Sequence, residues 1–148
     1  MNALNEAQVI RALYEASRAG VEIDLIVRGA CTLLPGIDGV SGNIRVRSVI
    51  GRFLEHSRVF YFCADQDESL YLSSADWMSR NMTRRIELAW PVQDPALRQR
   101  IIDECLIAYL HDGRDAWDLS SDGQYHRVGL TAPGPGAQQA LMQRYSAN

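Results

Sequence analysis

The chain has 148 residues, of which 47% are hydrophobic and 22% are charged, and its formal net charge is −3. This length and composition are typical of one soluble globular domain, and the net negative charge disfavours a protein whose whole surface binds a polyanion such as nucleic acid. No apolar run approaches the roughly 18 residues that a membrane-spanning helix needs, and the N-terminus lacks the layout of a signal peptide. We therefore expect a cytoplasmic protein.

The first half of the chain predicts alternating helix and strand. A stripe of apolar residues in "NEAQVIRALYEASRAG" indicates a helix that stops near Gly20, and "VEIDLIV" indicates a strand that ends at Arg28. A loop rich in glycine and proline, residues 30–43, separates this strand from "IRVRSVI", a second strand with one charged face. A helix followed directly by a strand favours an α/β architecture.

The second half predicts a β-hairpin and then a long helix. The hairpin strands are "RVFYF" and "SLYLSS", joined by an acidic loop over residues 63–68, and residues 74–81 form a turn or one helical turn. A strand "IELAWPV" precedes the helix 94–113, for which Asp94 is the expected N-cap. The remainder predicts one or two edge strands over 114–130, a linker over 131–136 and a terminal helix over 137–148.

The basic residues are unusual because all fifteen are arginine. The absence of lysine excludes a Walker A phosphate loop and a lysine Schiff base. From Arg28 to Arg85 eight arginines face six acidic residues, so this middle segment carries +2 and the two flanks together carry −5. Three widely spaced cysteines, Cys31, Cys63 and Cys105, are interpreted as reduced core residues, because they do not have the spacing of a disulfide or zinc framework.

Two residues are candidates for contact with phosphate. Arg28 ends an apolar strand, where ligands collect in α/β sheets, and its guanidinium offers a planar set of donors to phosphate oxygens. His56 is the histidine flanked by arginines, and a neutral imidazole can accept a proton or attack phosphorus. The alternatives are a surface arginine that caps a strand and a histidine that fills a polar position at a strand entrance.

The stretch "SSADWMSRN" is a third candidate. Its hydroxyls, together with Arg80 and Asn81, could gather hydrogen-bond donors around an anion. Equally, Ser74 or Asp76 could be the N-cap of a short helix. No metal-ligand spacing is present, so we predict no metal site within this chain.

Three blocks, "VEIDLIVRGACTLLPGI", "NIRVRSVIGRFLEHSRVFYF" and "YLSSADWMSRNMTRRIELAWPV", together resemble the C-terminal domain of bacterial polyphosphate kinases of the first family. The resemblance runs in order from about Met1 to Leu110. It implies a single α/β domain over residues 1–148 with a phospholipase D-like mixed β-sheet flanked by α-helices, in which residues 132–148 are a peripheral C-terminal segment. The family carries a lysine just before "MNAL", so we expect this chain to be a fragment of a longer one.

The resemblance implies an ATP:polyphosphate phosphotransferase that moves the terminal phosphate of ATP reversibly, through a phosphohistidine on a preceding domain. It implies Mg²⁺ bound mainly outside this chain. Arg28 matches the arginine of the family's "VRG" block and His56 the histidine of its "LEHSR" block, so both are implied ATP or phosphate contacts, with His56 catalytic and Arg80 and Asn81 in support. The implied partners are ATP or ADP, polyphosphate and the remaining domains of the same polypeptide, in a homo-oligomer that can lie peripherally on the inner membrane.

Two other functions stay open. A phospholipase D signature needs a lysine two residues after its histidine, but here Arg58 stands at that position, and Cys63 lies near the expected aspartate. This departure weighs against a stand-alone phospholipase D-like phosphodiesterase. A non-catalytic module that binds polyanions or mediates assembly is the second alternative.

Overall fold

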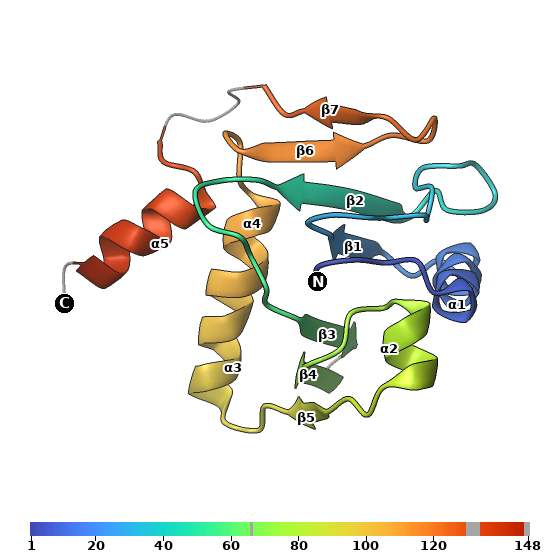
Figure 1. Ribbon diagram of the computed structural model, residues 1–148, viewed down its shortest axis with the longest axis horizontal. Helices are drawn as coiled ribbons and strands as arrows, with labels where there is room; N and C mark the ends of the chain where they lie inside the picture. Colours follow the sequence, from blue (N-terminus) through green and yellow to red (C-terminus); the bar gives the residue numbers. More distant parts are fainter. Residues whose placement is uncertain (66, 130–133, 147–148) are drawn as a thin grey trace.

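The computed structural model describes residues 1–65, 67–129 and 134–146, which form two β-sheets with helices packed around them (Figure 1). The mixed α/β architecture with flanking helices is confirmed, with the strands divided between two sheets. Along the described chain the elements are α1 (Ala7–Arg18), β1 (Ile23–Ile26), β2 (Ile44–Val49), β3 (Val59–Ala64), β4 (Asp67–Ser73), α2 (Ser79–Arg84), β5 (Ala89–Pro91), α3 (Pro95–Ile101), η1 (Ile102–Ile107), α4 (Ala108–Leu110), β6 (Ala116–Leu119), β7 (Tyr125–Arg127) and α5 (Ala137–Ser146).

The larger sheet has the strand order β1-β2-β6-β7 and contains the main core. β1 is parallel to β2, with Leu25 opposite Val46, and the other two pairs are antiparallel. The inward-facing residues of β1 and β2 are apolar, so they pack against the apolar stripe of α1. The buried members of this core are Leu4, Leu25, Val27, Leu33, Ile44, Val46 and Leu119.

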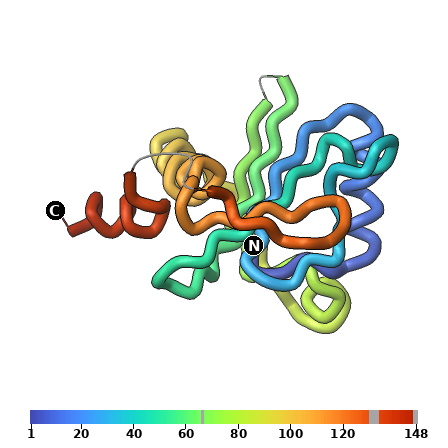
Figure 2. The backbone as a smooth tube through the Cα atoms, turned by 90° about the horizontal axis from the view of Figure 1, so that it is seen from above, coloured from blue at the N-terminus to red at the C-terminus, as the bar shows by residue number. Residues whose placement is uncertain are grey.

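The smaller sheet is antiparallel, with the order β3-β4-β5. The predicted hairpin is confirmed, but the acidic loop is shorter than expected, because Cys63 pairs with Glu68 and Ala64 with Asp67. Asp65 has a positive φ of 54°, which the tight turn requires. As Figure 2 shows, this hairpin projects beside β1 and β2, which explains why Cys63 is exposed and is not the core residue that we expected.

The long helix begins as predicted. Asp94 is its N-cap and accepts a hydrogen bond from the backbone nitrogen of Leu97 at 2.9 Å, and Pro95 occupies the first turn. Its middle, η1, is a π-helix, which apolar periodicity does not reveal. At its C-terminal end the buried Tyr109 packs with Val49, Ala116 and Ala137 in a second core cluster.

The predicted terminal helix is α5, which extends away from the sheets in Figure 1. The sequence places residues 132–148 at the periphery, yet the first two residues of α5, Ala137 and Gln138, are buried, and Ala137 belongs to the second core cluster. Residues 131–133 of the predicted linker lie outside the described residues. Among the described residues, no helix combines the length and the apolar character that crossing a membrane would require.

Candidate functional site

Arg28 lies two residues after the end of β1, and its backbone is held by hydrogen bonds on both sides. Its carbonyl accepts a hydrogen bond from the hydroxyl of Ser48 at 2.9 Å, and its backbone nitrogen donates to the carbonyl of Met1 at 3.2 Å. The guanidinium of this half-buried residue donates through Nη1 to the backbone carbonyl of Glu55. The side chain of Arg28 therefore reaches the residue that immediately precedes His56.

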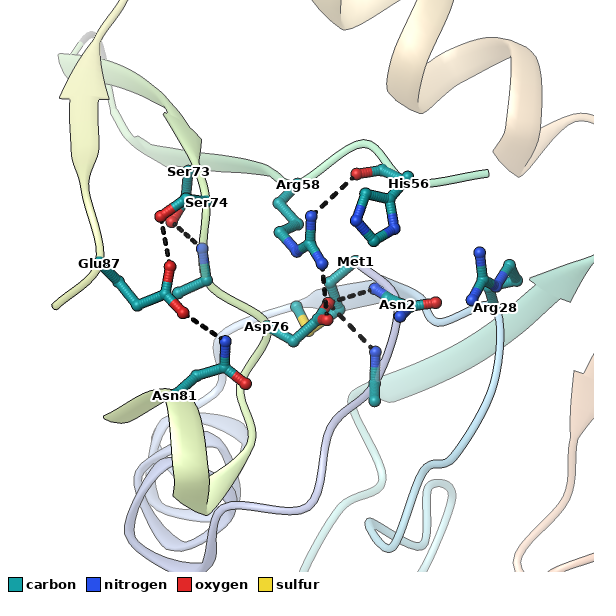
Figure 3. A network of polar contacts seen from close by, with 12 residues as sticks. Met1, Asn2, Arg28, His56, Arg58, Ser73, Ser74, Asp76, Asn81 and Glu87 are labelled. Carbon is teal, nitrogen blue, oxygen red and sulfur yellow. Dashed lines mark hydrogen bonds and ion pairs between the residues drawn. The ribbon is translucent and has the colours of Figure 1, made fainter. Parts of the chain in front are cut away.

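His56 lies on the segment between β2 and β3, and its side chain is exposed. In Figure 3 its imidazole lies on the same side of the site as Arg28. No hydrogen bond of the imidazole is found within the described part of the chain. The two candidates thus come together from separate parts of the chain. The guanidinium of Arg28 is held in place by Glu55, and the imidazole of His56 is open to solvent.

The segment that carries His56 is held by Gln138, which is 5% exposed. The backbone nitrogen of Phe53 donates to Oε1 of Gln138 at 2.8 Å, while Nε2 of Gln138 donates to the carbonyl of Phe53 at 2.9 Å and to Glu55 Oε1 at 2.8 Å. A Cβ on Gly51 would lie 2.4 Å from the same Gln138 oxygen, so a larger residue there would displace the Gln138 side chain from these contacts. We call these contacts the Gln138 clamp.

Tyr109 extends the Gln138 clamp to the long helix by donating its hydroxyl proton to Glu55 Oε1. Burial raises the pKa of Tyr109, and the neighbouring Glu55 carboxylate raises it further. The phenol therefore stays protonated and able to donate at neutral pH. The backbone of Glu55 binds Arg28 while its carboxylate binds α4 and α5, so this residue connects the site to the body of the domain.

Arg58 and Asp76 form a buried ion pair behind His56. Nη2 of Arg58 lies 2.9 Å from Asp76 Oδ2, and the exposed fractions of the two side chains are 11% and 4%. Nη1 of Arg58 also donates to the carbonyl of His56 at 3.2 Å. The other oxygen of Asp76, Oδ1, accepts the backbone nitrogens of Asn2 at 2.7 Å and Ala3 at 3.3 Å. The pair therefore joins the segment of His56, the chain after β4 and the N-terminal residues.

The protonation of Asp76 follows from these contacts. Burial by itself raises the pKa of its carboxyl, but the hydrogen bond from Arg58, the backbone donors and the positive charge of Arg58 together lower it. Asp76 is therefore a carboxylate at neutral pH. This carboxylate neutralises Arg58, so the Arg58 guanidinium is not free to bind a ligand anion. Its role is to support the backbone of His56.

Asn81 lies apart from Arg28 and His56, and Arg80 stays a predicted phosphate contact. Arg80 is exposed on α2, whereas Asn81 is buried and donates through Nδ2 to Glu87 Oε1 at 2.6 Å. Glu87 also accepts the hydroxyl of Ser74. In Figure 3 the Asn81–Glu87 pair lies on the opposite side of Asp76 from His56. α2 begins at Ser79 without a side-chain cap, so neither Ser74 nor Asp76 is its N-cap.

The comparisons with known proteins agree on one family. Residues 1–139 match the family model described as polyphosphate kinase C-terminal domain 2. The chain belongs to this family. The polyphosphate kinase of Xylella fastidiosa (strain Temecula1) is 58% identical over 128 residues, which are 86% of this chain and 18% of that protein. The polyphosphate kinase of Burkholderia multivorans is 53% identical over 145 residues, covering 98% of this chain and 21% of that protein.

A solved structure agrees with these relatives. The crystal structure of polyphosphate kinase from Porphyromonas gingivalis superposes on this chain with a TM-score of 0.92 and 44% sequence identity, covering 99% of this chain and 22% of that one. The present chain thus spans about a fifth of the length of the polyphosphate kinases that it matches.

The polyphosphate kinase resemblance predicted Arg28 and His56 as phosphate contacts, but it did not predict the residues that hold them. Gln138 lies more than eighty positions from the segment that it clamps, and no pattern in the sequence indicates a structural role for Glu55. Arg58 was the one sign in the sequence of such a supporting contact, since an arginine that becomes buried needs a carboxylate partner. Nothing in the sequence indicates that Asp76 is that partner.

The groups around His56 do not fit a magnesium ion. Mg²⁺ prefers carboxylate and water oxygens, whereas Arg28, Arg58 and the imidazole contribute nitrogen groups, and both oxygens of Asp76 are already used. Within residues 1–65, 67–129 and 134–146 no group of three or more histidine, cysteine, aspartate or glutamate side chains could hold a metal ion. The guanidinium of Arg28 is a group suited to an anion rather than to a metal ion.

Proposed function

We propose that this chain supplies ATP- and phosphate-binding residues to a polyphosphate kinase, which transfers the terminal phosphate of ATP reversibly to polyphosphate through a phosphohistidine on a preceding domain. One observation carries the proposal: Arg28 at the end of β1 holds the backbone of Glu55 and so fixes the position of the exposed His56 beside it. The partners are ATP or ADP, polyphosphate and the remaining domains of the same polypeptide, in a cytoplasmic homo-oligomer.

Arg28 is the group suited to the charge of the reaction. A phosphoryl group in transfer spreads negative charge over its equatorial oxygens, and a prepositioned guanidinium stabilises that charge without reorganisation. The other arginines of the middle strands have partners within the domain, because Arg45 pairs with Asp24 and Arg47 with Asp118. Arg28 uses only Nη1 to bind the carbonyl of Glu55, so its other guanidinium nitrogens can bind a ligand. It is the guanidinium beside His56 that lacks a carboxylate partner in the described chain.

His56 acts on the same phosphate. We assign it the transfer of a proton to or from a phosphate oxygen, since its exposed ring lies at the open side of the site and its backbone is fixed by Arg58. Magnesium would accompany the nucleotide phosphates and be held by other parts of the polypeptide. Because Asp76 occupies Arg58, the domain lacks a free cation at the lysine position of a phospholipase D signature, which weighs against independent phosphodiesterase activity.

The test uses full-length polyphosphate kinase that carries this sequence. We expect Arg28→Ala and His56→Ala each to lower ATP-dependent polyphosphate synthesis by roughly a hundredfold or more, as expected for loss of a charge-stabilising or proton-transferring group. His56→Gln, which keeps a hydrogen-bonding group but cannot titrate, should lose as much as His56→Ala. Arg45→Ala is the matched control and should retain nearly full activity, because Arg45 is exposed on β2 and paired with Asp24.

Survival of synthesis in both Arg28→Ala and His56→Ala would overturn the site assignment and favour a binding or assembly module. A fully active His56→Gln would limit His56 to holding phosphate. Phosphodiesterase turnover by the 148-residue chain that disappears in His56→Ala would instead support the hydrolase alternative.

A further inference from the structure

A groove separates the two sheets. It has a volume of about 1010 Å³ and lies between β1, β3 and the long helix, with α1 at one side. In Figure 1, β1 and β3 lie on either side of the N-terminal segment. Most of the lining side chains are apolar, among them Leu13, Ile23, Phe60, Leu106 and Ile107. An opening of this size lined by core-type side chains indicates a surface that a further element covers.

The edge of β1 that faces the groove has backbone N–H and C=O groups that can pair with a further strand. The backbone nitrogen of Ile23 donates to Asn43 at 2.9 Å and that of Val27 donates to Arg47 at 2.8 Å, both toward β2. Because backbone direction alternates along a strand, the polar groups of Asp24 and Ile26 point the other way, into the groove. Within the described residues no strand pairs with this edge of β1.

The edge of β3 that faces the groove also has backbone groups that can pair with a further strand. The backbone nitrogen of Ser73 donates to the carbonyl of Arg58 at 3.0 Å, and the register places Val59 opposite Leu72. Alternation then turns the backbone groups of Phe60 and Phe62 toward β4 and those of Val59, Tyr61 and Cys63 toward the groove. β3 is the outer strand of its described sheet. Two strand edges therefore face one apolar groove.

The N-terminal residues show how that groove is entered. The backbone nitrogen of Met1 donates to the carbonyl of Ile26 at 2.8 Å, and the backbone nitrogen of Arg28 donates to the carbonyl of Met1 at 3.2 Å. This reciprocal pattern is that of a parallel ladder, with Met1 opposite Val27. A chain that preceded Met1 in the same direction would run along β1 from Ile23 to Ile26, through the groove.

We propose that the residues preceding Met1 in a full-length polyphosphate kinase of this family form a strand in this groove, parallel to β1 and antiparallel to β3. This inference rests on the proposed function, in which the chain is part of a longer polypeptide, and the polyphosphate kinases that it matches are about five times its length. The strand has about five residues, apolar on both faces because α1 and the long helix cover it. It joins the two sheets into one continuous mixed sheet.

The strand also affects the candidate site. Arg28 follows β1 and His56 precedes β3, so a strand that pairs with both edges fixes the two sheets, and with them the two side chains, relative to each other. The same groove could in principle accept a second copy of this chain. The parallel ladder at Met1 favours the chain's own continuation, because it already enters the groove at one end.

The experiment extends Met1 with the ten or so residues that precede the matched region in the Xylella fastidiosa relative, and follows amide hydrogen exchange by NMR. We expect exchange at Asp24, Ile26 and Tyr61 to slow by about tenfold or more relative to the 148-residue chain. Val46, in the interior strand β2, is the internal reference and should be unchanged. The matched control is the same extension with proline at alternate positions, which cannot complete the ladder and should give no protection.

Unchanged exchange at Asp24 and Tyr61 would overturn the proposal. It would also be overturned if the unextended chain became protected as its concentration rose and sedimentation showed a dimer, because a second copy would then fill the groove.

A second measurement does not depend on the folding of the short chain. In an active full-length chimera, single cysteines placed along the preceding residues should form a disulfide with Cys63 at one position and not at its neighbours, and Cys63→Ser should abolish it. No crosslink at any position would also overturn the proposal. Neither readout involves catalysis, so the proposed function can fail while the strand is present.

Discussion

At the scale of single residues, Asp76 is a buried side chain that supports the site. It is 3% exposed and contacts two other segments, through Arg58 and through the adjacent Asn2 and Ala3. A buried ion pair is costly to break on one side, because the remaining charge loses its partner without regaining water. Asp76 therefore sets the position of Arg58, which in turn supports the backbone of His56.

We expect Asp76→Asn to lower the free energy of unfolding by about 3 kcal/mol, as measured by urea denaturation, because it leaves the buried guanidinium of Arg58 without a counter-charge. The matched control is Asp24→Asn on β1, which removes an exposed partner of Arg45 and should cost less than about 1 kcal/mol. Equal losses in the two variants would show that the buried pair has no special role.

The same carboxylate predicts a pH dependence. Because the pKa of Asp76 is lower in the folded chain than in an unfolded one, its contribution to stability is complete above about pH 5 and is lost as the pH falls through the folded value. In Asp76→Asn this part of the acid destabilisation should disappear, so the stability difference between the two proteins should narrow below about pH 4. A difference that stays constant with pH would contradict the assignment.

Sequence information led to the two residues that we propose contact phosphate, but not to the residues that support them. Arg28 and His56 could be predicted because each belongs to a recognisable block and each has side-chain chemistry suited to phosphate. Asp76 and Gln138 could not be, since their roles depend on which distant backbone groups the fold places beside them. Asn81 has suitable chemistry too, but the fold directs its amide to Glu87.

At the scale of elements, α5 and the segment between β2 and β3 act together. The Gln138 clamp fixes a segment that has no regular hydrogen bonding of its own, at the position from which His56 projects. Asp112 holds α5 in turn, by accepting the backbone nitrogen of Ala137 at 2.7 Å. A helix that looks terminal in the sequence therefore positions the candidate catalytic histidine.

We expect Gln138→Ala to release this segment, because it removes both donors and the acceptor that hold Phe53 and Glu55. Trypsin should then cleave after the exposed Arg52 several times faster than in the parent chain, and stability should fall by about 1–3 kcal/mol. Gln139→Ala is the matched control, since Gln139 is the exposed neighbour on the same helix. Equal cleavage rates in the two variants would show that the clamp does not order the segment.

Element types followed from the sequence more readily than their ends. The long helix and the hairpin were predictable from apolar periodicity and from the Asp94 cap. The π-helical middle of the long helix was not, because it leaves no compositional mark. The acidic residues of the hairpin suggested a wide loop, but Glu68 and Asp67 sit on exposed strand positions where charge is tolerated.

At the scale of the whole molecule, the distribution of arginines narrows the possible function. The middle segment carries an excess of positive charge, but three of its eight arginines, Arg45, Arg47 and Arg58, are each paired with an aspartate. Arg28, beside His56, has no carboxylate partner among the described residues. Such a guanidinium is consistent with our proposal that another domain completes a phosphoryl-transfer site.

The central claim is that this domain assists a phosphoryl transfer whose covalent intermediate lies elsewhere. It is tested most directly by incubating the full-length enzyme with ATP labelled in its terminal phosphate and mapping the acid-labile label. We predict that the label lies on a histidine outside the 148 residues of this chain, that His56→Gln is still labelled at that position, and that Arg28→Ala is labelled much more slowly. Label found on His56 itself would contradict the account.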